Sequence, residues 1–328
     1  MRDNGSNSAG MPAVVAENLQ KRYGNFVAVD GVALQVAPGE IFGFLGPNGA
    51  GKSTTIAMLT TILRPSGGKA FVEGFDVERN AKEVRMTSGV ALQEIGMDDM
   101  MTAQEVLTLQ GRIFGMSSKQ AGRRADELLD LVDLRDVANK RVGKYSGGMR
   151  RRLDLAVALV HRPSILFLDE PTTGLDPASR RTVWNEIRRL NSEAGMTIFL
   201  TTQYLEEADS LGDRIAIIDH GKIVAEGRPA ELKAELGTSS IVFRFDRHGM
   251  VQKAVDHFRA HGMDPKTEKL ELRLYTADAA SKVPSIVAEL DRAGIEISSL
   301  TLAEPSLDDV FLQVTGALYT EEPAKESA

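Results

Sequence analysis

The sequence predicts an α/β fold with a mostly parallel sheet, followed by a small α+β domain. Short runs that are apolar nearly throughout suit strands buried on both faces of a parallel sheet. These runs are 41–45, 165–168, 198–200 and 215–218. Helical apolar spacing lies between them, over 53–63, 179–193 and 205–211. A glycine-rich loop joins the first run to the first helix, as in α/β proteins that bind phosphate.

The remaining elements follow in chain order. Runs 14–19, 27–29 and 32–36 alternate loosely and are separated by Gly24, Gly31 and Pro38-Gly39, so we expect an antiparallel β patch. The first helix places its apolar residues on one face, namely Ile56, Leu59, Ile62 and Leu63. Residues 100–162 are helical in pattern without a strand-like run, which predicts a helical insertion in the α/β core.

The chain has 328 residues, which suggests two domains. We assign 13–236 to the larger domain and expect the leader, 1–12, to be disordered. The stretches 228–229 and 237–240 mark a boundary. Strands at 241–245, 270–275 and 295–302, with helices at 251–261, 277–293 and 306–315, then form an α+β domain over 240–316. The polar tail, 317–328, is expected to be flexible.

Composition excludes several classes of function. The absence of cysteine rules out disulfides, thiolate metal sites and cysteine nucleophiles. The net charge of -7 argues against a protein that coats nucleic acid. No run approaches the roughly 18 apolar residues of a membrane span, so any membrane role is expected to go through a partner.

Residues 46–53 match the phosphate-loop pattern G-x-x-x-x-G-K-[ST], between a predicted strand and a predicted helix. Glycines let backbone N–H groups curl toward phosphate oxygens, and the helix adds its positive N-terminus. Lys52 is expected to reach the β- and γ-phosphates, and Ser53 to coordinate Mg²⁺. The predicted ATP-binding residues here are Gly46, Pro47, Asn48, Gly49, Ala50, Gly51, Lys52, Ser53 and Thr54. The alternative is a plain glycine-rich turn before a helix.

Two acids end the apolar run 165–168. Asp169, at the carboxyl end of the strand, is suited to hold Mg²⁺ through water. Glu170 is then placed to orient and polarise the attacking water. Acids after a strand also cap helices, but the upstream phosphate loop favours the metal and catalytic roles.

Further motifs make residues 14–235 resemble the ATP-binding-cassette (ABC) ATPases, a P-loop NTPase family. Residues 145–149, Tyr-Ser-Gly-Gly-Met, resemble the family's signature motif and precede a predicted helix. Asp176 resembles the D-loop aspartate, Gln93 the Q-loop glutamine, and Tyr23 the aromatic residue that stacks on adenine. Ser-Gly-Gly alone would favour an ordinary loop and helix cap, so the resemblance depends on the joint order of the motifs.

The resemblance implies ATP and Mg²⁺ as cofactors, with Gln93 joining Ser53 and Asp169 as a metal ligand. It also implies a head-to-tail homodimer. Each ATP would lie between the phosphate loop of one copy and the signature motif of the other, which comprises Ser146, Gly147 and Gly148, with Asp176 nearby. A signature motif at a helix N-terminus makes physical sense as a second anion site. ATP would then hold the dimer closed, and hydrolysis would open it.

The sequence departs from the family pattern at several positions. Gln203 stands where most ABC ATPases have a histidine. Its amide can donate a hydrogen bond to γ-phosphate and accept one from water, but it cannot carry the histidinium charge. We therefore expect Gln203 to act with Glu170 and Lys52 in catalysis, at a rate the sequence leaves open. Tyr145 and Met149 replace the usual Leu and Gln.

Residues 145–156, 201–209 and 305–311 resemble the daunorubicin-resistance branch of the family. That resemblance implies a subunit for export of drugs, antibiotics or lipids. It would dock as a peripheral protein on the cytoplasmic face of the membrane, against a separate permease. The helical insertion, 100–162, and Gln93 are expected to contact that permease.

Two alternatives remain open at this point. One is a soluble ABC ATPase that acts on ribosomes or DNA, and the other is a ligand-binding protein that ATP only switches. The run Arg150-Arg151-Arg152 invites a nucleic-acid interpretation. Three charges on one short segment do not make a binding face in an acidic protein. We expect these arginines to face nucleotide, a partner subunit or acidic neighbours.

Overall fold

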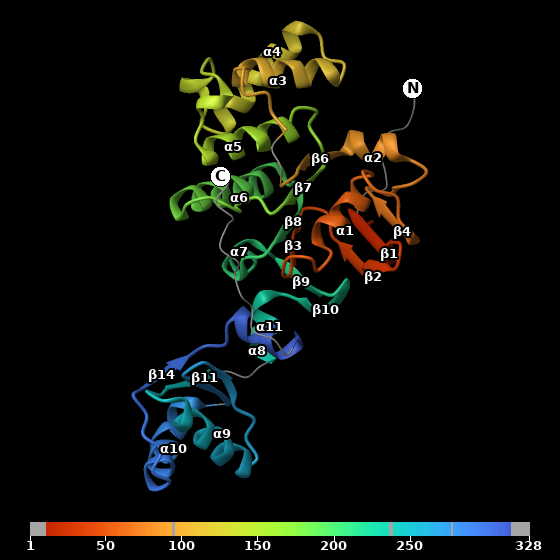
Figure 1. Ribbon diagram of the computed structural model, residues 1–328. Helices are drawn as coiled ribbons and strands as arrows, with labels where there is room; N and C mark the ends of the chain where they lie inside the picture. Colours follow the sequence, from red (N-terminus) through yellow and green to blue (C-terminus); the bar gives the residue numbers. More distant parts are fainter. Residues whose placement is uncertain (1–10, 94–95, 236–238, 277, 316–328) are drawn as a thin grey trace. The chain divides into compact units, whose positions relative to one another are not determined.

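The computed structural model describes residues 11–93, 96–235, 239–276 and 278–315 (Figure 1). The chain forms two compact units that meet in the sequence at Glu226 and Gly227. The predicted tail, 317–328, and most of the predicted leader, 1–12, lie outside the described residues. No helix among the described residues is both long and apolar enough to cross a membrane.

The larger unit is built around a six-stranded sheet of order β10-β9-β3-β8-β7-β6. Its strands are β3 (Ile41–Leu45), β6 (Ser88–Ala91), β7 (Ile165–Asp169), β8 (Thr197–Thr202), β9 (Arg214–Asp219) and β10 (Lys222–Gly227). Strand β8 pairs in parallel with both β3 and β7, while β9 and β6 extend the parallel pairing on either side. The predicted mostly parallel sheet is confirmed.

Successive residues of the central strands enter two different hydrophobic clusters. Ile41 and Ile198 pack on the side of the helical insertion, whereas their neighbours Phe42 and Phe199 pack on the opposite side. Every residue of β3 and β7 is buried. A strand covered on both faces needs an apolar residue at almost every position, so continuous apolar runs identified these strands.

Helices cover the first of these sides. They are α3 (Ala103–Ile113), α4 (Ser118–Leu131), α5 (Gly147–Ala158), α6 (Pro177–Ala194) and α7 (Leu205–Leu211), with 3₁₀ turns η1 (Arg135–Val137) and η2 (Val142–Lys144). Figure 1 shows α3, α4 and α5 gathered at one end of the unit. The predicted helical insertion is confirmed, since its described residues hold helices and one isolated bridge, Thr102 to Arg141.

The other side carries an antiparallel sheet of order β2-β1-β4-β5, as predicted for the first strands. Its elements are β1 (Val14–Tyr23), β2 (Phe26–Val36), β4 (Gly67–Val72) and β5 (Phe75–Asp76), with helices α1 (Lys52–Leu59) and α2 (Ala81–Thr87). The predicted helix 53–63 is too long. Thr61 adopts a left-handed φ of 66° just after α1, so Ile62 leaves the apolar face and is 56% exposed.

The smaller unit contains a four-stranded sheet of order β12-β13-β11-β14. Its elements are α8 (Pro229–Glu235), β11 (Ser239–Arg244), α9 (His248–Ala260), β12 (Lys266–Glu268), β13 (Glu271–Thr276), α10 (Ala279–Arg292), β14 (Ser299–Ala303) and α11 (Leu307–Thr315). Helices α9 and α10 pack on one face of the sheet through a core that includes Phe243, Phe258 and Leu290. The sequence did not predict α8 or β12. Helix α8 belongs to this unit, which begins at Gly227. The domain bounds expected from the sequence, 13–236 and 240–316, stay a prediction.

Candidate active site

The glycine-rich loop after β3 takes backbone conformations that favour glycine. Gly49 and Gly51 have φ values of 79° and 109°, and Gly51 is the N-cap of α1. A Cβ on Gly51 would lie 2.6 Å from the carbonyl oxygen of Ala28, and a Cβ on Gly46 would lie 2.3 Å from that of Ile218. The loop therefore curls tightly into the N-terminus of α1, the geometry that binds an anion.

Lys52, the first residue of α1, turns back over this loop. Its Nζ donates hydrogen bonds to the carbonyl oxygens of Gly46 and Pro47 at 2.8 and 3.1 Å. The same Nζ lies 3.0 Å from Oε1 of Glu170, and both side chains are almost fully buried. The structure thus joins the phosphate loop to the predicted catalytic carboxylate.

Side-chain oxygen atoms of Ser53, Asp169 and Thr201 lie close together beside this pair. The Ser53 hydroxyl donates to Oδ1 of Asp169 at 3.2 Å, and the Thr201 hydroxyl donates to the same oxygen at 2.5 Å. Strand β8 lies between β3 and β7, so Thr201 stands opposite both Phe44 and Asp169 in the parallel register. The sequence did not assign a role to Thr201, because only the strand order brings it to Asp169.

Glu170 itself sits on a strained backbone. Its φ is 48°, a left-handed conformation that is uncommon for residues other than glycine. Its N–H donates to the carbonyl and hydroxyl oxygens of Thr201 at 3.1 and 3.0 Å. The side chain accepts hydrogen bonds from Gln93 Nε2 at 3.4 Å and from the Thr173 hydroxyl at 3.2 Å. Such over-determined strain is characteristic of functional sites.

A pocket of about 300 Å³ joins these groups. Its lining residues are Tyr23, Phe26, Ala28, Asn48, Gly49, Gly51, Lys52, Ser53, Thr54, Gln93 and Glu170. Tyr23 and Phe26 pair across the β1–β2 hairpin and are 48% and 63% exposed. Two exposed aromatic rings at the mouth offer a stacking surface for a base. The sequence did not single out Phe26, because Tyr23 and Phe26 lie outside the predicted strand runs 14–19 and 27–29 and are paired only by the register of the hairpin.

The signature residues lie together elsewhere in the larger unit. Ser146 is the N-cap of α5, and its hydroxyl accepts from the N–H of Met149 at 3.3 Å. Asp176 is the N-cap of α6, and hydrogen bonds from the hydroxyl and N–H of Ser179 lower its pKa. A Cβ on Gly148 would lie 2.8 Å from that hydroxyl, so the signature and D-loop segments are in close contact.

Of the predicted site residues, some lie outside the pocket lining as described. These are Gly46, Pro47, Ala50, Ser146, Gly147, Gly148, Asp169, Asp176 and Gln203. Gln203 follows β8 and is only 6% exposed. Asp169 reaches the site through Ser53. The signature group does not line the pocket beside the phosphate loop, whereas the carbonyl of Thr202, the residue before Gln203, accepts a hydrogen bond from the N–H of Gly46 at 3.2 Å.

The arginine run has acidic neighbours within the chain, one of the surroundings expected for it. Arg150 pairs with Asp99 at 2.8 Å, and Arg152 with Asp133 at 3.4 Å. Arg151 is buried and pairs with Asp154 at 2.9 Å. Burial raises the pKa of Asp154 to about 6 and lowers the pKa of Arg151. These pairings leave no free basic patch on this run.

Comparison with known proteins identifies the family. Residues 29–173 match the ABC transporter family, and residues 227–315 match the C-terminal domain of DrrA1-3-like ATP-binding proteins. The chain is 45% identical over 304 residues to the daunorubicin resistance ATP-binding protein DrrA3 of Streptomyces coeruleorubidus, covering 93% of this chain and 96% of the relative. The chain belongs to the DrrA-like ABC transporter ATP-binding proteins.

Other relatives of this ABC ATPase show the breadth of the family. The chain is 38% identical over 306 residues to the Nod factor export ATP-binding protein I of Cupriavidus metallidurans, covering 91% of this chain and 96% of the relative. The dimeric, post-hydrolysis structure of the ATP-binding cassette MJ0796 bound to ADP and Pi superposes with a TM-score of 0.60 at 28% identity. That match covers 66% of this chain and 98% of the cassette. As an ABC ATPase, the chain binds and hydrolyses ATP.

Proposed function

We propose that this ABC ATPase energises an export transporter by acting on a separate membrane permease from the cytoplasmic face of the membrane. The observation that carries the proposal is the meeting of Lys52, Ser53 and Glu170 at one pocket, with Asp169 joined to it through Ser53. Relatives named for daunorubicin resistance and for Nod factor export support a drug, antibiotic or lipid-like cargo.

ATP would place its phosphates in the loop from Gly46 to Ser53 and its adenine against Tyr23. Mg²⁺ would be held by Ser53, Asp169 and Gln93, whose hydroxyl, carboxylate and amide oxygens are the donors it prefers. The convergence of Ser53 and Asp169 on one point fits such an ion. When bound, Mg²⁺ supplies positive charge at the β- and γ-phosphates.

Glu170 is proposed as the group that orients the attacking water. Phosphate oxygens compete with Glu170 for the ammonium of Lys52. Nucleotide binding would therefore free the Glu170 carboxylate, which still receives hydrogen bonds from Gln93 and Thr173. Gln203 would donate its amide to the γ-phosphate, which requires the buried side chain to reach the pocket.

A second copy of the chain completes the site in this proposal. Gly147 and Gly148 lie against Leu175 and Ser179, on either side of Asp176 in the chain. The residues Ser146, Gly147, Gly148 and Asp176 do not line the pocket of their own chain. A helix N-terminus presented by a partner would add anion-binding N–H groups to the γ-phosphate. ATP would thus bridge the two copies, as the similarity to a dimeric cassette supports.

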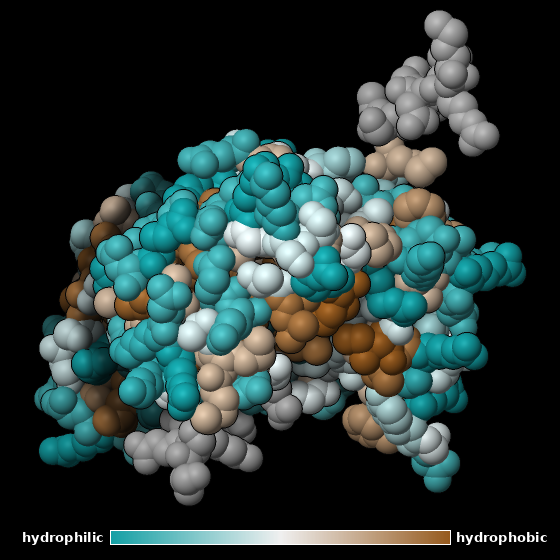
Figure 2. All heavy atoms as spheres, turned by 90° about the horizontal axis from the view of Figure 1, so that it is seen from above, coloured by the Kyte–Doolittle hydropathy of each residue, from teal (hydrophilic) through white to brown (hydrophobic). Residues whose placement is uncertain are grey.

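The permease is proposed to dock in a groove beside α3. This groove has a volume of about 230 Å³ and includes Ile62, Phe114 and His161 in its lining. Ile62 is 56% exposed and Ile113 on α3 is 68% exposed, which is unusual for large apolar side chains. Figure 2 shows several brown, hydrophobic patches among teal and white residues on the face seen from above, one of them just right of the middle. An apolar segment of a permease loop fits this surface.

The test is the oligomeric state of Glu170→Gln in ATP and Mg²⁺, measured by size-exclusion chromatography with light scattering. The substitution removes the carboxylate that activates water and leaves the phosphate contacts, so a stable ATP-bound dimer is expected. Lys52→Ala in the Glu170→Gln background is the matched control and should stay monomeric. A monomeric Glu170→Gln protein that still binds ATP would refute the dimer.

Turnover decides between this proposal and an ATP-switched binding protein. The wild-type chain is expected to hydrolyse ATP in a Lys52-dependent way, and the permease is expected to accelerate it. Absence of Lys52-dependent turnover even with the permease present would favour the switch.

A further inference from the structure

The Arg151 side chain makes four hydrogen bonds beside the active site, and the proposed mechanism does not use it. It lies in the second turn of α5 and is 4% exposed. Its Nε donates to the carbonyl of Pro171 at 2.8 Å, and its Nη2 to the carbonyl of Asp169 at 3.1 Å. Its Nη1 donates to the carbonyl of Leu92 at 2.7 Å and to Asp154 Oδ2 at 2.9 Å.

The three carbonyls belong to segments that carry the chemistry. Leu92 immediately precedes Gln93, and Asp169 and Pro171 flank Glu170 on either side. One planar guanidinium therefore spans the Q-loop, the peptide group that leads into Glu170 and the peptide group that follows Pro171. A guanidinium presents five N–H donors in a rigid fork, whereas an ammonium is a single point that cannot span these acceptors.

The backbone that Arg151 holds is the strained one. Glu170 has its left-handed φ of 48° between the two carbonyls that Arg151 binds. A strained conformation persists only where surrounding contacts over-determine it. Thr201 fixes the N–H of Glu170, and Arg151 fixes the carbonyls on both sides, so together they set where the carboxylate points.

Stability alone does not account for a charge at this position. Burial of an ion pair carries a desolvation penalty that well-packed apolar residues avoid. Burial accordingly lowers the pKa of Arg151 and raises that of Asp154, so both groups are held at a disadvantage in their charged forms. A buried charged group with this bonding is better explained by the geometry it imposes.

We propose that Arg151 is a positioning residue that fixes Gln93 and Glu170 relative to the signature helix α5. Helix α5 begins at Gly147, directly after Ser146, so the rigid helix connects the chain's own carboxylate to the signature it presents to a partner. This inference rests on the proposed function, because it assigns Arg151 to the same hydrolytic site. Arg151 touches no reacting atom and acts through Glu170 and Gln93.

The test compares Arg151→Lys with Arg152→Lys in the purified full-length chain. Arg152 is a matched control, since it lies on the same helix and also binds carbonyl oxygens, those of Val132 and Asp133, away from the site. Arg151→Lys keeps the charge near Asp154 but loses the fork. Its kcat is expected to fall about 10- to 100-fold, the scale for groups that orient first-shell ligands. Arg152→Lys is expected to stay within about twofold of wild type.

Two further readouts separate positioning from folding. The Mg²⁺ concentration for half-maximal turnover should rise several-fold in Arg151→Lys, because Gln93 is less well placed, while the affinity for ATP in excess Mg²⁺ should change less than about twofold. The thermal midpoint and circular dichroism measure the folded fraction. Wild-type Mg²⁺ dependence and kcat in Arg151→Lys, or a kcat loss equal to the loss of folded protein, would overturn the proposal.

A second variant covers the case in which Arg151→Lys does not fold. Asp154→Asn keeps the guanidinium and its carbonyl bonds and removes only the anchoring charge. It should raise the Mg²⁺ requirement in the same direction but by less, and an unchanged Mg²⁺ requirement would refute the positioning role. Lys52→Ala tests the proposed function separately: if this variant hydrolyses ATP as fast as the wild type, the proposed function fails. The role of Arg151 is then tested by measuring how the binding of a fluorescent ATP analogue to Arg151→Lys depends on the Mg²⁺ concentration.

Discussion

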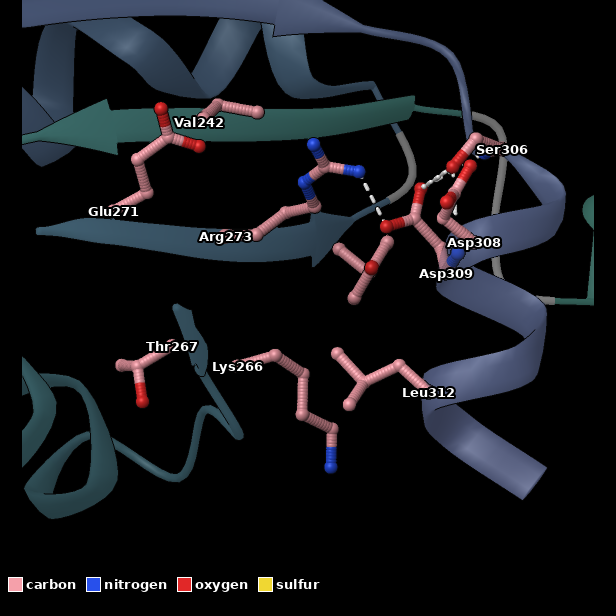
Figure 3. A pocket seen from close by; sticks show the side chains of 10 residues that line it. Val242, Lys266, Thr267, Glu271, Arg273, Ser306, Asp308, Asp309 and Leu312 are labelled. Atoms are coloured by element: carbon pink, nitrogen blue, oxygen red, sulfur yellow. Dashed lines mark hydrogen bonds and ion pairs between the residues drawn. The ribbon is translucent and has the colours of Figure 1, made fainter. Parts of the chain in front are cut away.

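Both units contain a pocket with a cation–carboxylate pair whose carboxylate is buried, yet the two pairs are built differently. In the larger unit, Lys52 contacts Glu170 together with two carbonyls of its own loop, and Glu170 sits on a left-handed backbone. In the smaller unit, Arg273 on β13 pairs with Asp309 on α11 beside a pocket of about 250 Å³ (Figure 3).

The second pair, Arg273 with Asp309, stabilises the fold of the smaller unit. Asp309 also accepts hydrogen bonds from the N–H and hydroxyl of Ser306, at 2.8 and 2.9 Å, so it caps α11 while it binds Arg273. Neither Arg273 nor Asp309 has a left-handed backbone. An ion pair with a buried carboxylate therefore does not by itself mark an active site, whereas such a pair on a strained backbone beside a phosphate loop does.

The largest expected effect is on turnover and comes from the first pair. Lys52→Met removes the ammonium that we propose to bind the phosphates, so ATPase activity should fall about 100- to 1,000-fold, as when one stabilising donor is lost from an active site. Steady-state hydrolysis by the purified chain measures it. Arg273→Met is the matched control and should keep turnover within about twofold. Equal losses in the two variants would contradict the distinction between the pairs.

The second expected effect is on stability, and here the larger change is expected from the Arg273–Asp309 pair. Arg273→Met leaves Asp309 as a buried charge without its cation, which should lower the free energy of unfolding of the smaller unit by about 3 kcal/mol. Hydrogen exchange of the α11 and β13 amides reports on that unit directly. Lys266→Met, which breaks the exposed pair with Asp264, is the control and should change stability by less than about 1 kcal/mol. A protected α11 in Arg273→Met would show that the pair is not structural.

The smallest expected effect concerns pH and the third buried pair, Arg151 with Asp154. Burial raises the pKa of Asp154 to about 6, so the folded state binds this proton more tightly than the unfolded state does. The contribution of Asp154 to stability should therefore fall as pH rises, by about 1.4 kcal/mol between pH 5 and pH 7. The measurement is the difference in unfolding free energy between wild type and Asp154→Asn at both pH values. A difference that does not vary with pH would refute the assignment.

Local features of this protein could be predicted because their physical causes are local. The phosphate loop is contiguous, and its glycines are required by the φ values of Gly49 and Gly51 and by the close approach of Gly46 to Ile218. The core strands are continuous apolar runs because both of their faces are buried. The first-turn acids of α11 follow Ser306, as expected for a helix N-terminus.

The smaller β elements at 67–91 and the strand β12 escaped prediction. The segment β5 has two residues and β12 has three, which is too short for a period to emerge. The end of α1 was also misplaced, because the left-handed turn at Thr61 leaves no signal in the residue type.

The sequence by itself determined the family, the phosphate loop and the identities of Lys52, Asp169 and Glu170. Only the tertiary structure decided that Thr201 binds Asp169 and that Phe26 joins Tyr23 at the pocket. It also decided that Arg151 donates hydrogen bonds to the carbonyls of Asp169 and Pro171. The reason is that such contacts join residues far apart in the chain. Their existence depends on strand order and register, since β8 must lie between β3 and β7 before Thr201 can reach the site.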